Sequence, residues 1–163
     1  MTIETVRLAF GDGANIVVGQ SHFIKTVEDL AEIMAASVPG AKWGLAFNEA
    51  SGPRLVRSEG TDPKLVAEAI ACAELVGAGH TFYLVIGAGA YPINVLDRIK
   101  ACPEVCRIFA ATANPLELVV ARDAQGAGIL GVIDGESPLG VETEADKVDR
   151  KAMLRRFGYK FGP

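Results

Sequence analysis

The feature that most constrains the fold is the stretch from Val76 to Leu96, which holds no Asp, Glu, Lys or Arg. Several glycines and a proline interrupt it, so it is typical of a strand, a turn and a helix start and not of a membrane-spanning helix. Its apolar centre, Thr81 to Ile86, predicts a strand buried on both faces in the middle of a sheet. The sequence therefore predicts a globular fold around this strand and no association with a membrane.

Helical patterns lie on both sides of this strand in the sequence. Asp62-Pro63 is a strong helix start, with a capping residue followed by proline at the first helical position. Thr26, with Asp29 three residues later, is a variant of the capping box. Four helices are predicted, which begin at Thr26, Pro63, Pro92 and Thr143 and end near Pro39, Gly77, Pro103 and Phe157.

Two hairpins are predicted as well. One joins Thr2 to Phe10 with Ile16 to Val18 through a Gly-Asp-Gly turn, and the other joins Leu116 to Ala121 with Ile129 to Ile133. Because hairpins break a strict alternation of strand and helix, we expect one compact mixed α/β domain over residues 1–163. Its sheet should be mixed, largely antiparallel and flanked by helices, as in α+β proteins. No repeat and no linker is predicted.

Composition narrows the class of protein further. Half of the 163 residues are hydrophobic and 22% are charged, which excludes an intrinsically disordered chain. The mean hydropathy of +0.27 is high for a small monomer and favours a buried interface between subunits. The net charge of −4 and the pI near 5.2 argue against nucleic acid as a partner.

The cysteines and the N-terminus bear on the compartment. Cys72, Cys102 and Cys106 form no CxxC pair, so we expect three reduced thiols and neither a disulfide framework nor a zinc site. The first ten residues contain Glu4 and Arg7 and no apolar core, so no signal peptide is predicted. We expect a cytoplasmic protein.

Glycine-rich strings suggest nucleotide sites, but only weakly. Residues 126–131 match GxGxxG, yet a strand and a turn follow where a dinucleotide site needs a helix, so a hairpin with positive φ angles is favoured. Residues 87–92 lie between a strand and a helix start, which leaves open a phosphate or nucleoside at that N-terminus. The chain has no GxxxxGK[ST] string, which excludes a P-loop kinase.

Two histidines stand at junctions between strands and helices, where sites tend to form. His22 follows the segment Ile16 to Ser21, and His80 directly precedes the apolar strand. Both are candidate catalytic residues, although a lone histidine is more often structural. Lys25 lies close to His22 in the sequence and is a candidate anion ligand; the alternative is a solvated lysine before a helix.

Further candidate binding residues are basic side chains and amides. Arg54 and Arg57 suit phosphate, because guanidinium matches its oxygens in a bidentate way; the alternative is ion pairs with Glu49 and Glu59. We group Glu49 with the substrate-binding residues. The amides that could read an adenine edge are Asn94 and Asn114, and for Asn114 an Asx turn before Pro115 is the alternative.

At these residues the sequence resembles the adenosine-specific kinase family of archaea and bacteria. The strings that carry the resemblance cover nearly the whole chain: GQSHFIKTVEDL (19–30), GLAFNEASGPRLVR (44–57), GAGHTF (77–82), PINVL (92–96), PEVCRIF (103–109), ATANP (111–115), GILGVIDG (128–135) and LRRFGYK (154–160). Each string is specific in its order and spacing.

The resemblance implies binding of adenosine or its monophosphate AMP, a phosphorylated histidine and a homotrimer. The two histidine motifs of the family fall on His22 and His80. This chain departs from the pattern at two positions, because Asn48 stands where many members have cysteine and Ala127 stands where arginine is expected. An arginine that contacts phosphate would be missing here, which predicts weaker binding of the monophosphate.

The leading hypothesis is a phosphotransferase that acts through phosphohistidine. The imidazole of His80 or His22 would attack a phosphoryl group and pass it to a ribose hydroxyl of adenosine. Lys25, Arg54 and Arg57 would neutralise the phosphoryl oxygens. The sequence identifies no phosphoryl donor and no metal ligands, and it leaves room for Mg²⁺.

Two rival functions follow from the same residues. A non-catalytic sensor of adenosine or AMP fits the missing P-loop, the lack of an obvious Mg²⁺-binding carboxylate cluster and the small size. A scaffold subunit fits the apolar surplus but leaves the polar strings unexplained.

Overall fold

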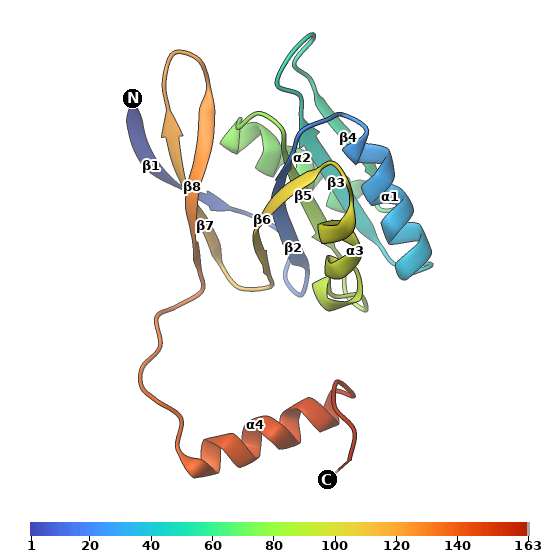
Figure 1. The fold of residues 1–163 in the computed structure, drawn as a ribbon, viewed down its shortest axis with the longest axis vertical. Helices are drawn as coiled ribbons and strands as arrows, with labels where there is room; N and C mark the ends of the chain where they lie inside the picture. The colour runs from blue at the N-terminus through green and yellow to red at the C-terminus, as the bar shows by residue number, and fades with distance from the viewer. Residues whose placement is uncertain (163) are drawn as a thin grey trace.

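The structure, a computed structural model, describes residues 1–162 (Figure 1). Its strands are β1 (Thr2–Leu8), β2 (Asn15–Ser21), β3 (Trp43–Asn48), β4 (Val56–Gly60), β5 (Thr81–Ile86), β6 (Val105–Thr112), β7 (Leu116–Arg122) and β8 (Ala127–Asp134). Its helices are α1 (Thr26–Ser37), α2 (Pro63–Val76), α3 (Leu96–Ala101), α4 (Glu144–Arg156) and the short 3-10 helix η1 (Pro92–Asn94). The mixed α/β fold class is confirmed. No helix among these residues is both long and apolar enough to cross a membrane.

A five-stranded antiparallel sheet forms the centre of the molecule, with the strand order β4-β3-β5-β2-β6. Strand β5 lies in the middle and every one of its residues is buried, as its apolar sequence predicts. One face packs against α2, mainly through Ala46, Tyr83 and Val85. The other face packs against α1 and α3, so both sides of the central strand are covered.

A second sheet has the order β1-β7-β8 and is also antiparallel. Val6 and Leu8 of β1 and Leu118 of β7 are buried in the core cluster that α2 shares with the central sheet. The predicted hairpin between β1 and β2 is therefore wrong, because β1 pairs with β7 and β2 pairs with β5 and β6. Alternation along β1 identifies a half-buried strand, but it does not specify the partner strand.

The second predicted hairpin, β7 with β8, is confirmed. It contains the GxGxxG string, with Gly126 at the turn and the other two glycines on β8. None of the three has a positive φ, so that part of the expectation is wrong. A dinucleotide site would require a helix directly after the string, and here the string continues as strand β8.

Of the predicted helix starts, the structure confirms the one at Asp62 and not the capping box at Thr26. The Asp62 side chain accepts hydrogen bonds from the N–H groups of Lys64 (3.0 Å) and Leu65 (3.3 Å), which confirms it as the cap of α2. The capping box at Thr26 is wrong, because Thr26 is already helical and its hydroxyl bonds the Phe23 carbonyl at 2.6 Å. The helix predicted from Pro92 is interrupted at Val95, so the element that directly follows the glycines of residues 87–92 is the three-residue 3-10 helix η1, and α3 begins only at Leu96.

The chain beyond β8 stands apart from both sheets (Figure 1). Residues 135–143 form neither helix nor strand, and Pro138 and Gly140 lie among them. Helix α4 follows, and none of its residues is buried. This connector corrects the expectation of a chain without a linker. We call residues 1–134 the body and residues 135–162 the arm.

Candidate functional site

A cleft of about 930 Å³ opens between the body's two sheets. Its walls are the turn between β3 and β4, the end of α2 and the tip of the β7–β8 hairpin. Glu49 and Arg54 from the predicted site line it. So do Asn48 and Ala127, the two positions at which the chain departs from the family pattern. Residues far apart in the sequence therefore meet in one cavity.

The turn between β3 and β4 is closed by Glu49. Its carboxylate accepts the Leu55 N–H at 2.8 Å and the Arg57 guanidinium at 2.8 Å, and these bonds lower the pKa of Glu49 below its usual value. The ion-pair alternative for Arg57 is thus what the structure shows. Glu49 holds the turn in shape, and its charge is already matched by Arg57.

Arg54 differs from Arg57 in its surroundings. It sits at the same turn with a φ of 55°, one of two non-glycine residues in the left-handed region among residues 1–162. Its guanidinium makes no hydrogen bond or ion pair with any described residue. A guanidinium at a cleft wall with unused donors is suited to bind an anion.

Asn48 lies at the inner wall of the cleft and is only 6% exposed. Its Nδ2 donates to the carbonyl oxygens of Ala73 at 3.0 Å and Ala78 at 3.1 Å. Because carbonyl oxygens only accept, these bonds fix the orientation of the amide. Its Oδ1 has no partner among residues 1–162 and is not enclosed by protein. The cleft wall thus offers one free acceptor, which our sequence reasoning had noted only as a departure.

Arg122 also lines the cleft and was missed by the sequence reasoning. Its guanidinium donates to the carbonyl oxygens of Val76 (2.7 Å) and Leu75 (2.9 Å) and pairs with Glu4 at 2.6 Å. It therefore caps the end of α2 and ties β1 and β7 to it. Each of its three nitrogens makes one of these bonds, so Arg122 is held in place as part of the wall of the cleft.

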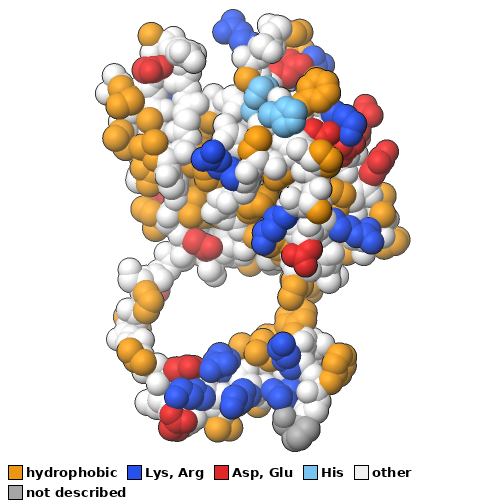
Figure 2. Space-filling view, viewed as in Figure 1, with side chains coloured by type: hydrophobic (Ala, Val, Ile, Leu, Met, Phe, Trp, Pro, Cys, Tyr) orange, Lys and Arg blue, Asp and Glu red, His pale blue; other side chains and the backbone are white. Residues whose placement is uncertain are grey.

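The two predicted histidines lie close together beyond the ends of the central strands. Figure 2 shows both imidazoles, in pale blue, side by side on one face. The His80 carbonyl accepts the N–H of Ser21 at 2.9 Å, which places His22 next to it. The His80 ring stacks on Phe47 with centroids 5.9 Å apart, and the His22 ring stacks on Phe23 at 6.3 Å.

His80 is linked to the cleft through its neighbours. Gly79 lines the cleft, and the His80 N–H donates to the Asn48 carbonyl at 2.7 Å. The backbone of His80 has a φ of 61°, a conformation that only residues without branching at Cβ adopt at modest cost. The chain thus turns sharply between the cleft wall and the His80 ring.

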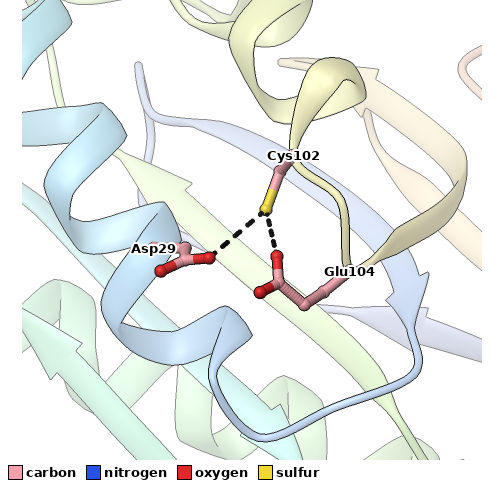
Figure 3. A group of neighbouring side chains, drawn as sticks. All are labelled: Asp29, Cys102 and Glu104. Carbon is pink, nitrogen blue, oxygen red and sulfur yellow. Dashed lines mark hydrogen bonds between the residues drawn. The ribbon is translucent and has the colours of Figure 1, made fainter.

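Lys25 pairs with a compact group of side chains, of which Figure 3 shows Asp29, Cys102 and Glu104. Its ammonium pairs with Asp29 and, at 2.8 Å, with Glu104, and the Cys102 thiol donates to the other oxygen of Glu104 at 2.8 Å. These hydrogen bonds raise the pKa of Lys25 and lower that of Glu104. Burial raises the pKa of the Cys102 thiol to about 11. The charge of Lys25 is thus matched within the protein.

The same cluster is the one group among residues 1–162 with enough close acidic and thiol ligands for a metal: Asp29, Cys102 and Glu104. Both carboxylates pair with Lys25, and the Cys102 thiol donates to Glu104, so in this structure these groups bond one another.

The two amides predicted to read adenine lie away from the cleft. Asn94 accepts the Tyr91 N–H at 3.0 Å and closes η1. Asn114 donates to Asp134 at 3.1 Å and lines a smaller cleft of about 340 Å³ near Arg7. All three cysteines are free thiols, as expected.

Comparison with known proteins places the chain in a family. The model of the adenosine specific kinase family matches residues 6–160. The crystal structure of the PH1918 protein from Pyrococcus horikoshii OT3 is similar, with 40% sequence identity, a TM-score of 0.93 and coverage of 99% of each chain. No curated protein matches. Since the family model covers nearly the whole length, the chain belongs to the adenosine specific kinase family.

Proposed function

We propose that the protein binds adenosine or AMP in the 930 Å³ cleft and transfers a phosphoryl group through a phosphohistidine on His80 or His22. One observation carries the proposal: the cleft is lined by Asn48, with its free acceptor, and by Arg54, with its free guanidinium, and His80 is hydrogen-bonded to the Asn48 backbone. These are the groups that a nucleoside with a phosphate needs. Membership of the family supports the choice of adenosine.

Asn48 is proposed to recognise the base. Its free Oδ1 can accept a hydrogen bond from the exocyclic amine of adenine. A 6-oxo purine places an acceptor at that position and would leave both groups unpaired, which costs more than a missing contact. We therefore propose Asn48 as a base-reading amide in the cleft. The proposed roles of Asn94 and Asn114 have less support, because neither lines this cleft.

Arg54 is proposed to hold the phosphate. It has unused donors at the cleft wall, whereas Arg57 and Lys25 are paired with carboxylates. We propose only a modest preference for AMP over adenosine, because position 127 supplies a methyl group and the Arg122 guanidinium is already paired with Glu4.

His80 is proposed as the first choice for the nucleophile. A neutral imidazole nitrogen attacks the phosphorus of a phosphate ester or anhydride donor, an N–P bond forms, and the donor's P–O bond breaks. A ribose hydroxyl of adenosine then attacks the phosphorus, the N–P bond breaks, and the imidazole takes up the hydroxyl proton. The proximity of His80 to the cleft wall favours it over His22, which is exposed beside Phe23.

The test is phosphorylation followed by transfer. Purified protein is incubated with ³²P-labelled nucleoside triphosphates, with and without Mg²⁺, and acid-labile, base-stable label is measured before and after addition of adenosine. His80→Gln should abolish the label, while His22→Gln should retain it. If both variants retain full labelling and transfer, the phosphohistidine mechanism is wrong.

A non-catalytic sensor of adenosine or AMP is the second candidate function. A phosphotransferase that uses Mg²⁺ needs carboxylates that are available to the metal. Asp29 and Glu104 instead pair with Lys25, and Glu49 pairs with Arg57, which favours a sensor. A sensor would show saturable binding of adenosine without labelled product from any donor. The same assay therefore separates the two functions.

We also propose a homotrimer in the cytoplasm. The resemblance to the family and the high mean hydropathy support the assembly. Three free thiols suit a reducing compartment. Light scattering of the purified protein would test the trimer, with a mass near three times 17.1 kDa expected.

A further inference from the structure

We infer that the Glu74 carboxylate binds the 2′ and 3′ hydroxyls of the ribose and thereby selects ribonucleosides over nucleosides that lack these hydroxyls. This role rests on the proposed function, the binding of adenosine or AMP in the 930 Å³ cleft. Asn48 and Arg54 are the proposed partners of the base and the phosphate, and Glu74 is the partner of the sugar that joins them.

Three carboxylates line the cleft, those of Glu49, Glu74 and Asp123. Glu49 is already paired with Arg57 at 2.8 Å. Asp123 uses its Oδ1 to accept two backbone N–H groups of the hairpin turn, at 2.9 and 3.3 Å. Glu74 is exposed and makes no ion pair or side-chain hydrogen bond within residues 1–162. It is therefore the carboxylate of the cleft whose two oxygens are both available to a ligand.

The fold places Glu74 beside the amide proposed to read the base. Glu74 lies in the last turn of α2, next to Ala73, whose carbonyl oxygen accepts the Asn48 Nδ2 at 3.0 Å. The loop after α2 is joined to the β7–β8 hairpin by a bridge between Ala78 and Ala127, so two walls of the cleft meet at this end of the helix. A nucleoside whose base contacts Asn48 therefore has its sugar near the end of α2.

The position of Glu74 on α2 is unfavourable for the stability of the helix. The carbonyl oxygens at the C-terminus of a helix give that end a partial negative charge, so an acidic residue in the last turn is destabilising. The last turn of α2 has no basic residue to compensate. Arg122 caps this end of the helix, but the carboxylate with which it pairs is that of Glu4. A side chain that breaks a local rule of helix formation without a compensating partner is expected at a functional site.

The chemistry of ribose fits an unpaired carboxylate. The 2′ and 3′ hydroxyls are neighbouring donors, and a carboxylate offers two acceptor oxygens, so one side chain can accept both O–H groups. Such bonds to an ionised acceptor are about twice as strong as bonds between neutral groups. Acidic residues hold the ribose of dinucleotides in the same way. The phosphate of AMP is attached through the 5′ carbon, so Glu74 can bind the two hydroxyls of adenosine and AMP alike.

Calorimetric titration of the full-length protein tests this role with adenosine, AMP and 2′,3′-dideoxyadenosine, which lacks both hydroxyls. The wild type should bind adenosine about 10-fold or more tightly than the dideoxynucleoside, because hydrogen bonds to a charged group are lost. Glu74→Ala should bring this ratio close to one, by weakening adenosine and AMP to the same extent and leaving the dideoxynucleoside unchanged. Glu74→Gln keeps an acceptor oxygen without the charge and should give an intermediate ratio.

Glu32→Ala is the matched control. Glu32 is exposed on α1 and does not line the cleft, so this variant removes the same charge elsewhere and should keep the ratio of the wild type. The thermal midpoint of the unliganded protein distinguishes a binding role of Glu74 from a structural one. Because the carboxylate is destabilising at the end of α2, Glu74→Ala should keep or raise this midpoint. A lower midpoint would indicate a structural role and overturn the inference.

The remaining outcomes distinguish this role from the proposed function. Equal affinities of the wild type for adenosine and 2′,3′-dideoxyadenosine would overturn the role of Glu74 and leave the binding of adenosine standing. A Glu74→Ala variant that keeps the ratio of the wild type would do the same. A wild-type protein that binds neither adenosine nor AMP would contradict the proposed function, and the role of Glu74 with it.

Discussion

The N–H of His80 donates to the carbonyl oxygen of Asn48 at 2.7 Å. This bond joins the end of β3 to the start of β5, and it couples the residue proposed to read the base to the residue proposed to carry phosphate. The bond holds His80 at a φ of 61°, in the left-handed region. Backbone strain at this position is the kind that often accompanies a functional site.

The first prediction distinguishes what the backbone conformation of His80 contributes to stability from what its imidazole contributes to phosphorylation. His80→Gly should change the free energy of unfolding by less than about 1 kcal/mol, because relief of the left-handed strain offsets the lost stacking on Phe47. The same variant should lose all phosphohistidine. His80→Val should be less stable than His80→Gly by about 1–2 kcal/mol. Urea unfolding measures these differences, and equal stability of the two variants would contradict the strain.

The second prediction concerns Asn48. Asn48→Leu removes the donor for the Ala73 and Ala78 carbonyls and should reduce the free energy of unfolding by about 2–4 kcal/mol. Asn94→Ala is the control, because its exposed amide makes one local bond and the loss should stay below about 1 kcal/mol. Calorimetric titration of the wild type should show adenosine bound at least 10-fold more tightly than inosine. Equal affinities would remove the proposed role of Asn48 in reading the base.

The third prediction addresses phosphate binding. Arg54→Asn should weaken AMP about 10-fold and leave adenosine unchanged, because only AMP has a charge for the guanidinium, and asparagine tolerates the positive φ. Ala127→Arg should tighten AMP selectively by placing a second charge at the cleft. Lys100→Asn, on the distant helix α3, is the control for lost surface charge. Parallel losses for AMP and adenosine would indicate a structural role for Arg54.

The fourth prediction concerns stability in acid. Hydrogen bonds from Cys102 and Lys25 lower the pKa of Glu104 from 4.5 to about 2. The ionised form is therefore favoured by folding, so its contribution is present above pH 4.5 and is lost as the pH falls towards 2. Glu104→Gln should flatten the fall in thermal midpoint over this interval. Glu117→Gln should leave the profile as it is in the wild type.

The fifth prediction concerns the thiols. Burial raises the pKa of both Cys72 and Cys102 to about 11, while Cys106 is exposed. Since the thiolate is the nucleophile, iodoacetamide at pH 8 should modify Cys106 first and the other two only on unfolding. Cys106→Ser should remove the fast phase seen by mass spectrometry. Rapid labelling of Cys102 in that variant would contradict the hydrogen bond from its thiol to Glu104.

Local signals in the sequence predicted most single elements. The apolar run at β5, the cap at Asp62 and the stop at Gly77 (φ 62°) each depend on a few neighbouring residues, and the structure confirms all three. The pairing of β1 did not follow from such signals. Val6 and Leu8 need a buried partner, but the choice of β7 over β2 depends on how two sheets pack around α2.

For the candidate site, too, some features followed from the sequence and others only from the tertiary structure. The sequence by itself determined which side chains could do chemistry: the two histidines, the basic turn at residues 54–57 and the two departures from the family pattern. Only the tertiary structure decided which charges are free. Lys25 and Arg57 are matched by carboxylates from elsewhere in the chain, whereas Arg54 and Asn48 line the cleft and Arg54 has no such partner. The physical reason is that ion pairing and burial depend on distances between segments remote in sequence, which no local pattern records.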